Sequence, residues 1–170
     1  MKLGEYQTLT IVKKVAFGVY LAESRDSQEK VLLPKSQVPA NAVLGDSMEV
    51  FLYRDSQDRM IATCARPKLT LGGLAVLRVS QIGKIGAFLD WGLEKDLFLP
   101  YKEMTMKVQP GDEILVTLYI DKSSRLCASM KKLYDLLSKE SPYKAGDMVE
   151  GRVYEFSDNF GTFLAVDDKY

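Results

Sequence analysis

The chain has 170 residues, 46% of them hydrophobic, with 23 basic and 23 acidic side chains and no histidine. Such a composition is typical of a globular protein, and no run approaches the roughly 18 apolar residues of a membrane span. Without histidine the commonest general base and zinc ligand are missing, together with every Ser-His or Cys-His nucleophile pair. We therefore expect a cytoplasmic protein that is not an enzyme and that uses no metal and no cofactor.

Residues 1–66 have the pattern of five short strands. Polar and apolar residues alternate or form brief apolar runs between Gly, Pro, Asp and Ser turn signals, as in strands. The runs lie at 6–12, 17–21, 31–33, 48–53 and 60–64. Pro34 is placed to open one helical turn between the third and fourth strands.

The same pattern returns 66 residues later without a gap. Gly45-Asp46, Asp55, Arg59 and Ala62 recur as Gly111-Asp112, Asp121, Arg125 and Ala128. The second set of expected strands lies at 74–82, 85–91, 96–99, 113–120 and 126–130. A repeat of this length suits a small barrel that buries its own core, so we expect separate domains at 1–66 and 67–130. Five strands with a small insertion after the third match the OB-fold, a partly open barrel.

A third copy begins after a short helical pattern. Leu133, Leu136 and Leu137 have helical spacing ahead of Ser141-Pro142, which predicts an amphipathic linker helix over 131–141. Residues 142–170 then repeat only the first two strands of a barrel, so we expect the intact protein to continue beyond them. A hairpin is marginal alone in water. It should therefore pair elsewhere, associate between chains by strand exchange or dimerisation, or be poorly ordered. The predicted fold is all-β: tandem five-stranded barrels, a linker helix and an incomplete third barrel.

The charges and the two cysteines are unevenly placed along the chain. The first copy carries nine basic and eight acidic side chains, the second ten and seven, and residues 133–170 four and eight. Any attraction to phosphate should therefore be local, modest and sensitive to salt. Cys64 and Cys127 end different copies, and we interpret them as reduced packing residues.

A glycine-centred motif opens the second strand of each copy. Phe17-Gly18-Val19-Tyr20 matches Ile85-Gly86-Ala87-Phe88 and Phe160-Gly161-Thr162-Phe163. Together with Gly-Asp before the fourth strand and Asp-x-x-x-Arg before the fifth, it resembles the S-one-type RNA-binding domain. The Leu-Pro variant of the third strand, the helical linker and the third copy resemble the conserved virulence factor B family of bacteria. That resemblance implies three barrels followed by a winged helix, RNA binding and control of virulence gene expression.

The resemblance also implies an RNA face on each barrel. It consists of two aromatic residues three apart, a histidine after the third strand, and an Asp and Arg four apart in the loop between the fourth and fifth strands. The stacking residues implied are Phe17, Tyr20, Phe88, Phe160 and Phe163. The arginines are Arg59 and Arg125, oriented by Asp55 and Asp121. The histidine does not carry over, because Leu32-Leu33-Pro34 and Phe98-Leu99-Pro100 occupy its place.

The chemistry of such a face follows from its side chains. An outward ring stacks on an unpaired base with little regard to sequence, at roughly 1–3 kcal/mol per base. An arginine can stack or bind phosphate bidentately, and a nearby carboxylate fixes its fork. Lys84 and Lys122 could add phosphate attraction.

Several interpretations stay open from the sequence. Residues three apart point to opposite faces of a strand, so Phe17 and Tyr20 share a face only if a bulge intervenes, which Gly18 or Gly86 could supply. Otherwise one ring belongs to the core. The aspartates also suit ordinary turn chemistry, and Trp91 suits either a second platform or a shield over the barrel.

Two functions are therefore weighed. The first is binding of single-stranded RNA by linked modules, in a bacterial regulator of gene expression, with single-stranded DNA left open as ligand. The alternative is a protein-interaction scaffold of degenerate barrels with little affinity for nucleic acid.

Overall fold

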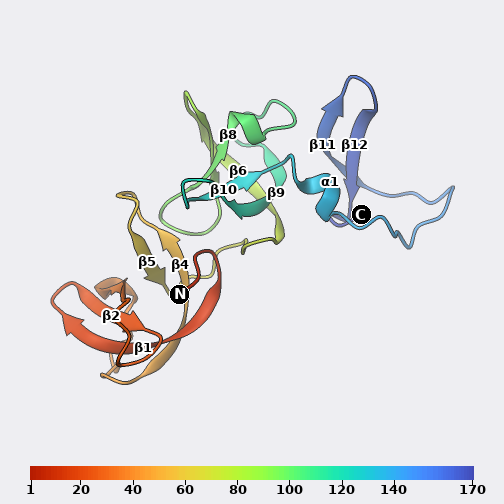
Figure 1. The fold of residues 1–170 in the computed structure, drawn as a ribbon. Helices are drawn as coiled ribbons and strands as arrows, with labels where there is room; N and C mark the ends of the chain where they lie inside the picture. The colour runs from red at the N-terminus through yellow and green to blue at the C-terminus, as the bar shows by residue number, and fades with distance from the viewer.

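The computed structural model describes residues 1–170, which form two β-barrels, a short helix and a hairpin in chain order (Figure 1). Barrel one is closed with strand order β1-β2-β3-β5-β4, and a parallel pair between Leu32 and Ile61 joins β3 to β5. Its strands are β1 (Tyr6–Val15), β2 (Gly18–Ala22), β3 (Val31–Pro34), β4 (Ser47–Arg54) and β5 (Met60–Thr63). Inward side chains such as Leu9, Leu21 and Leu52 are fully buried and fill its interior.

Barrel two repeats this plan with strand order β10-β9-β6-β7-β8. Its strands are β6 (Leu74–Ile82), β7 (Gly86–Asp90), β8 (Leu97–Pro100), β9 (Glu113–Ile120) and β10 (Leu126–Ser129). β8 lies against β10 without a hydrogen-bonded ladder, so this barrel is partly open. Short 3₁₀ turns, η1 (Lys35–Gln37) and η2 (Tyr101–Glu103), follow the prolines that end β3 and β8. The predicted tandem OB-fold plan is confirmed.

Gly18 and Gly86 allow β2 and β7 to approach the neighbouring strand closely. A Cβ atom on Gly18 would lie 2.2 Å from the Leu33 carbonyl oxygen, and one on Gly86 would lie 2.3 Å from the Leu99 carbonyl oxygen. The irregularities in pairing lie instead on the partner strands, between Ile11 and Lys13 in β1 and at the equivalent place in β6. These glycines are therefore needed for close packing.

Gly86→Ala is expected to destabilise the chain by about 1–3 kcal/mol, because the added methyl group must push β7 away from β8. Urea unfolding measures this difference. Gly83→Ala in the same turn is the control, since its Cβ would meet only ordinary contacts. Equal stability of the two variants would contradict the packing role.

The two barrels share a hydrophobic cluster. Phe51 of β4 is fully buried and contacts Trp91, which follows β7, with ring centroids 5.8 Å apart. Tyr6 of β1 lies against the same Phe51 ring at 5.4 Å. A backbone hydrogen bond joins the barrels as well, from Leu71 N to the Gly4 carbonyl at 3.0 Å, and Lys68 N donates to the Trp91 carbonyl at 2.8 Å, which fixes the start of the second domain beside Trp91. The barrels therefore have a fixed arrangement.

The linker contains a single helical turn, α1 (Leu133–Leu136), where the spacing predicts a longer helix over 131–141. Leu137 already has extended backbone angles, which end the helix. Leu133 and Leu137 are buried, whereas Leu136 is exposed. Only Leu133 and Leu137 therefore contribute to the core.

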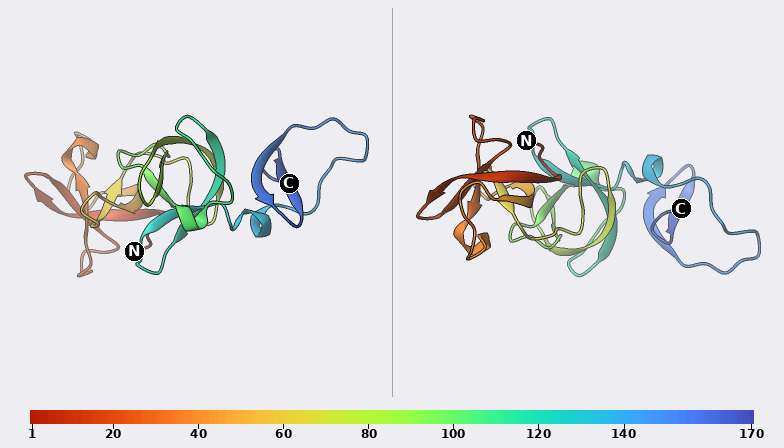
Figure 2. Two further views of the ribbon diagram at one scale, coloured as in Figure 1. Left: turned by 90° about the horizontal axis from the view of Figure 1, so that it is seen from above. Right: turned by 90° about the horizontal axis from the view of Figure 1, so that it is seen from below.

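The C-terminal hairpin packs on barrel two, on the side away from barrel one (Figure 2). Its strands are β11 (Gly151–Ser157) and β12 (Gly161–Val166). Tyr154 and Ala165 are buried in the cluster of barrel two, and Arg152 donates to the Glu113 carbonyl at 3.1 Å. The hairpin was expected to pair elsewhere, to associate between chains or to be poorly ordered, and in the structure it packs against its own chain. The four-residue α1 is far too short to span a lipid bilayer, and the chain has no other α-helix that could do so.

Candidate nucleic-acid interface

The face of barrel one presents Phe17 and Tyr20 side by side. Their ring centroids lie 6.4 Å apart at 84°, an edge-to-face pair, and Phe17 is 57% exposed. Phe17 stands in the turn before β2, so strand alternation does not apply to it, and Tyr20 lies half-buried on the strand. Neither ring lies in the core. Tyr20 pairs with Leu32 of β3. Leu32 lies in the segment where the S-one-type domain has its histidine.

The face of barrel two has a different pair of rings. Phe88 of β7 and Phe98 of β8 are cross-strand partners, with ring centroids 5.5 Å apart and a tilt of 40°. Ile85, in place of the first family aromatic, is 68% exposed. Phe98 was not among the residues predicted for the site. It lies 66 residues after Leu32, so the repeat offset and the pairing of β7 with β8 are the signals that could have revealed it.

The aspartates of the two β-hairpins hold their turns in the same way. Asp55 Oδ1 accepts hydrogen bonds from the backbone N–H groups of Gln57 at 2.9 Å and Arg59 at 3.0 Å. Asp121 Oδ1 does the same for Ser123 at 2.8 Å and Arg125 at 3.0 Å. The turn interpretation of both aspartates therefore holds.

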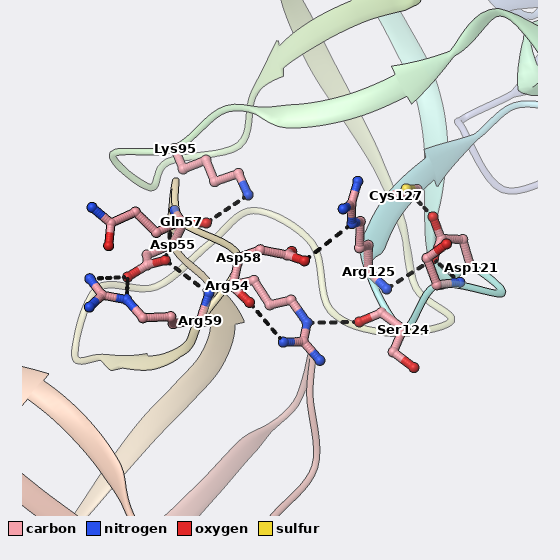
Figure 3. Close-up of polar contacts among 11 residues, drawn as sticks. Arg54, Asp55, Gln57, Asp58, Arg59, Lys95, Asp121, Ser124, Arg125 and Cys127 are labelled. Carbon is pink, nitrogen blue, oxygen red and sulfur yellow. Dashed lines mark hydrogen bonds and ion pairs between the residues drawn. The ribbon is translucent and has the colours of Figure 1, made fainter.

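The two arginines have different partners. Arg59 is held by its own Asp55, whose Oδ2 lies 3.1 Å from both Nε and one terminal guanidinium nitrogen of Arg59. The Arg125 guanidinium forms no ion pair with Asp121. Its Nε lies 3.4 Å from Asp58 Oδ2, in the hairpin of barrel one (Figure 3). The other carboxylate oxygen of Asp121 accepts from the Cys127 thiol at 3.6 Å.

The β4–β5 hairpin of barrel one reaches over the face of barrel two. Arg54 Nε donates to the Ser124 carbonyl at 2.8 Å, and Lys95 Nζ donates to the Asp55 carbonyl at 3.0 Å (Figure 3). A cleft of about 490 Å³ lies between this hairpin and barrel two. Barrel one contributes Tyr53, Arg54, Ser56 and Asp58 to its lining, and barrel two contributes Gln81, Ile85, Phe88, Trp91, Phe98 and Arg125, among others.

Trp91 lines this cleft and also belongs to the cluster between the barrels. It is only 2% exposed, and its Nε1 donates to the Lys95 carbonyl at 2.7 Å. Trp91 is therefore closer to the shielding role considered from the sequence than to an open stacking platform.

The remaining predicted residues lie apart from the cleft. Lys84 and Lys122 are exposed at the tips of the β6–β7 and β9–β10 turns. Phe160 is 80% exposed in the turn between β11 and β12. Phe163 packs instead against Tyr134 and Tyr154, with centroids 5.7 Å and 6.1 Å away. Phe160 and Phe163 thus form no ring pair.

The cysteines also differ. Burial, followed by the charge of Asp121, raises the pKa of the Cys127 thiol to about 12, so this thiol is protonated and donates to Asp121. Cys127 is a buried packing residue as expected, whereas Cys64 is exposed. No group of three or more Cys, Asp or Glu side chains is arranged to hold a metal ion.

The Asp55 contacts predict acid sensitivity. Burial opposes ionisation, but the backbone N–H groups of Arg59 and Gln57 and the Arg59 guanidinium lower the pKa of Asp55 below 3.8. A lowered pKa contributes stability that is present above the unfolded value and is lost as the pH falls through the folded value. Asp55→Asn should therefore lower the melting temperature at pH 7, by an effect of about 1 kcal/mol or less, and the difference should shrink below pH ~4.

Thermal unfolding at pH 7 and pH 3 measures this effect. Asp121→Asn is the matched comparison, because the equivalent hairpin lacks the guanidinium contact, and it is expected to lose less. A difference for Asp55→Asn that grows on acidification would contradict the assignment.

Tandem OB-fold barrels with outward rings beside an arginine define a class of nucleic-acid-binding proteins. The chain belongs to the S1 domain family, which it matches over residues 3–65 and 71–131. These are the S-one-type barrels that the sequence motif indicates, and S1 domains are nucleic-acid-binding modules.

The chain is similar to several bacterial proteins. The chain is 27% identical to the uncharacterized protein YitL of Bacillus subtilis over 99% of this chain and 58% of the relative. It is 24% identical to conserved virulence factor B of Staphylococcus haemolyticus over 84% of this chain and 50% of the relative. A crystal structure from Streptococcus pneumoniae, described as a multidomain protein with nucleic acid binding domains, has the same fold, with a TM-score of 0.68, 20% identity, and coverage of 98% and 60%. The chain spans 50–60% of the length of these proteins.

Proposed function

We propose that this chain binds single-stranded RNA without catalysing a reaction, and that barrel two carries the main contact. The observation that supports it most is the pair formed by Phe88 and Phe98, which offers ring surface at a cleft that also holds the Arg125 guanidinium. Rings hold bases by stacking, and an arginine beside them can bind the phosphate of the same strand.

Barrel one would add a second, weaker contact. Phe17 and Tyr20 offer ring edges and faces to solvent, and Arg59 lies on the hairpin that joins this face to the cleft of barrel two. Because the barrels are fixed relative to each other, a strand bound at one site meets the other at a high effective concentration. Lys84 and Lys122 would strengthen phosphate attraction around barrel two.

The biological setting is part of the proposal. In this proposal the chain acts in the bacterial cytoplasm as a regulator of gene expression, and the relative named conserved virulence factor B supports a connection with virulence. In this proposal residues 1–66 and 67–130 are the two RNA-binding domains, 131–141 is the linker, and 142–170 is the start of a third barrel.

Fluorescence anisotropy with short homopolymeric RNAs at two salt concentrations tests the proposal. Binding is expected at low salt and should weaken as salt rises. Arg125→Ala should weaken it further and lower its salt dependence, with little change in melting temperature, because this arginine is exposed. Homopolymeric DNA in parallel distinguishes the two ligands. Absence of RNA binding at low salt would overturn the proposal in favour of the interaction scaffold.

Besides RNA binding by the barrels, we propose that the chain self-associates through its C-terminal hairpin. Phe156, Phe160 and Leu164 stay exposed on it, at 62%, 80% and 52%. Exposed apolar groups on a hairpin with free edges favour strand exchange or dimerisation. Sedimentation at increasing protein concentration measures this, and Phe156→Glu should shift any dimer towards monomer.

A further inference from the structure

The cleft between the barrels has one wall from each of them. We propose that it is a composite site for one unpaired nucleotide, in which the β4–β5 hairpin of barrel one forms the second wall. In the free protein the Asp58 carboxylate occupies the position on Arg125 that the phosphate of the nucleotide would take. This inference rests on the proposed RNA binding and assigns to it a site that neither barrel forms alone.

The hairpin of barrel one is held over barrel two from both sides. Arg54 is bound to the Ser124 carbonyl, and Lys95 is bound to the Asp55 carbonyl, at 2.8 Å and 3.0 Å. The Arg54 guanidinium also donates to the Asp58 carbonyl at 3.0 Å, which ties the end of the hairpin to the same contact. The second wall is thus fixed before any ligand arrives, which lowers the ordering cost of binding.

The cleft is suited in size and lining to a base. Its volume of about 490 Å³ lies in the range of roughly 300–1,000 Å³ of small-ligand sites. Phe88 and Phe98 supply apolar ring surface on one side, and Ser56 and Asp58 supply polar groups on the other. A base would stack on the rings while its polar edge faces the hairpin.

Asp58 competes for the group that a phosphate needs. A carboxylate and a phosphate bind the guanidinium fork in the same manner. The Asp58–Arg125 pair is 3.4 Å long, and its side chains are 47% and 60% exposed, so it contributes little to stability and exchanges readily. A phosphate of bound RNA would replace Asp58 on Arg125.

The first test blocks the wall from barrel one. Ser56→Leu fills the cleft from an exposed turn position, whereas Gln57→Leu changes the neighbouring residue, which does not line it. We expect at least fivefold weaker binding of a short homopolymeric RNA by Ser56→Leu and unchanged binding by Gln57→Leu. Trp91 lines the cleft and is the only tryptophan of the chain, so its fluorescence should change when RNA binds.

The second test removes the competitor. Asp58 has a left-handed backbone (φ 63) that asparagine tolerates, so Asp58→Asn keeps the turn. It should bind RNA roughly two- to fivefold more tightly, the size expected for loss of an exposed ion pair. The gain should vanish in an Arg125→Ala background. Asp158→Asn, in the C-terminal turn, controls for the loss of one negative charge and should leave the affinity unchanged.

The outcomes separate this inference from the function on which it rests. If the wild-type chain binds no RNA at low salt, the proposed function itself fails. If RNA binds but Ser56→Leu equals Gln57→Leu, Asp58→Asn equals Asp158→Asn, and Trp91 fluorescence is unchanged, the composite site alone is overturned. A gain in Asp58→Asn that persists without Arg125 would overturn the exchange of carboxylate for phosphate.

Discussion

Phe88→Ala is expected to weaken RNA binding about 5- to 150-fold, because one stacked base contributes roughly 1–3 kcal/mol. The ring lies half-buried on β7 and contacts Phe98 across the strands. Phe98→Ala should produce a loss of the same order, since it removes the other half of the ring pair. Anisotropy titrations at constant salt measure both effects.

A control separates stacking from a general loss of exposed apolar surface. Phe156→Ala removes an aromatic ring that is 62% exposed on the C-terminal hairpin, away from the cleft, and should leave RNA affinity unchanged. Melting temperatures of all three variants are recorded alongside. Equal affinities of Phe88→Ala and Phe156→Ala would contradict the assignment of the stacking face.

Phe51→Ala is expected to cause the largest loss of stability, about 3–5 kcal/mol, because it deletes a fully buried ring. Phe51 belongs to β4 of barrel one but contacts Trp91 of barrel two and Tyr6. The deletion should therefore lower the stability of both barrels together. Urea unfolding followed by circular dichroism and by Trp91 fluorescence reports on both.

Coincident unfolding curves from the two probes are expected for the wild type and for Phe51→Ala. Ile85→Ala is the control, because its side chain is 68% exposed and such a change should alter stability by no more than about 0.5 kcal/mol. A Phe51→Ala variant in which the Trp91 signal keeps its wild-type midpoint would show that the shared cluster does not couple the barrels.

The barrels themselves could be predicted from the sequence because the turn motifs and apolar alternation that specify them are local and occur in both copies. Gly45-Asp46 and Gly111-Asp112 mark equivalent turns, and the alternation of apolar residues gives each strand within a few positions. Gly18 and Gly86 were also recognised as special, although their role is the close approach of neighbouring strands. Repetition made each of these patterns visible.

The site was less predictable because its decisive contacts join residues far apart in the chain. Phe98 becomes a partner of Phe88 only through the pairing of β7 with β8. The contact of Arg125 with Asp58 crosses between barrels, and no spacing within one repeat encodes it. Phe163 has the right position in its motif, yet it packs against Tyr134 because the linker folds back on the hairpin.

The ring of Phe51 has a consequence for how such a protein can be taken apart. Because Phe51 packs into the cluster of barrel two and not into the interior of barrel one, an isolated first barrel would leave Tyr6 and Phe51 facing water. Expressing the first barrel alone, or grafting it onto another scaffold, would expose this apolar contact surface and favour aggregation.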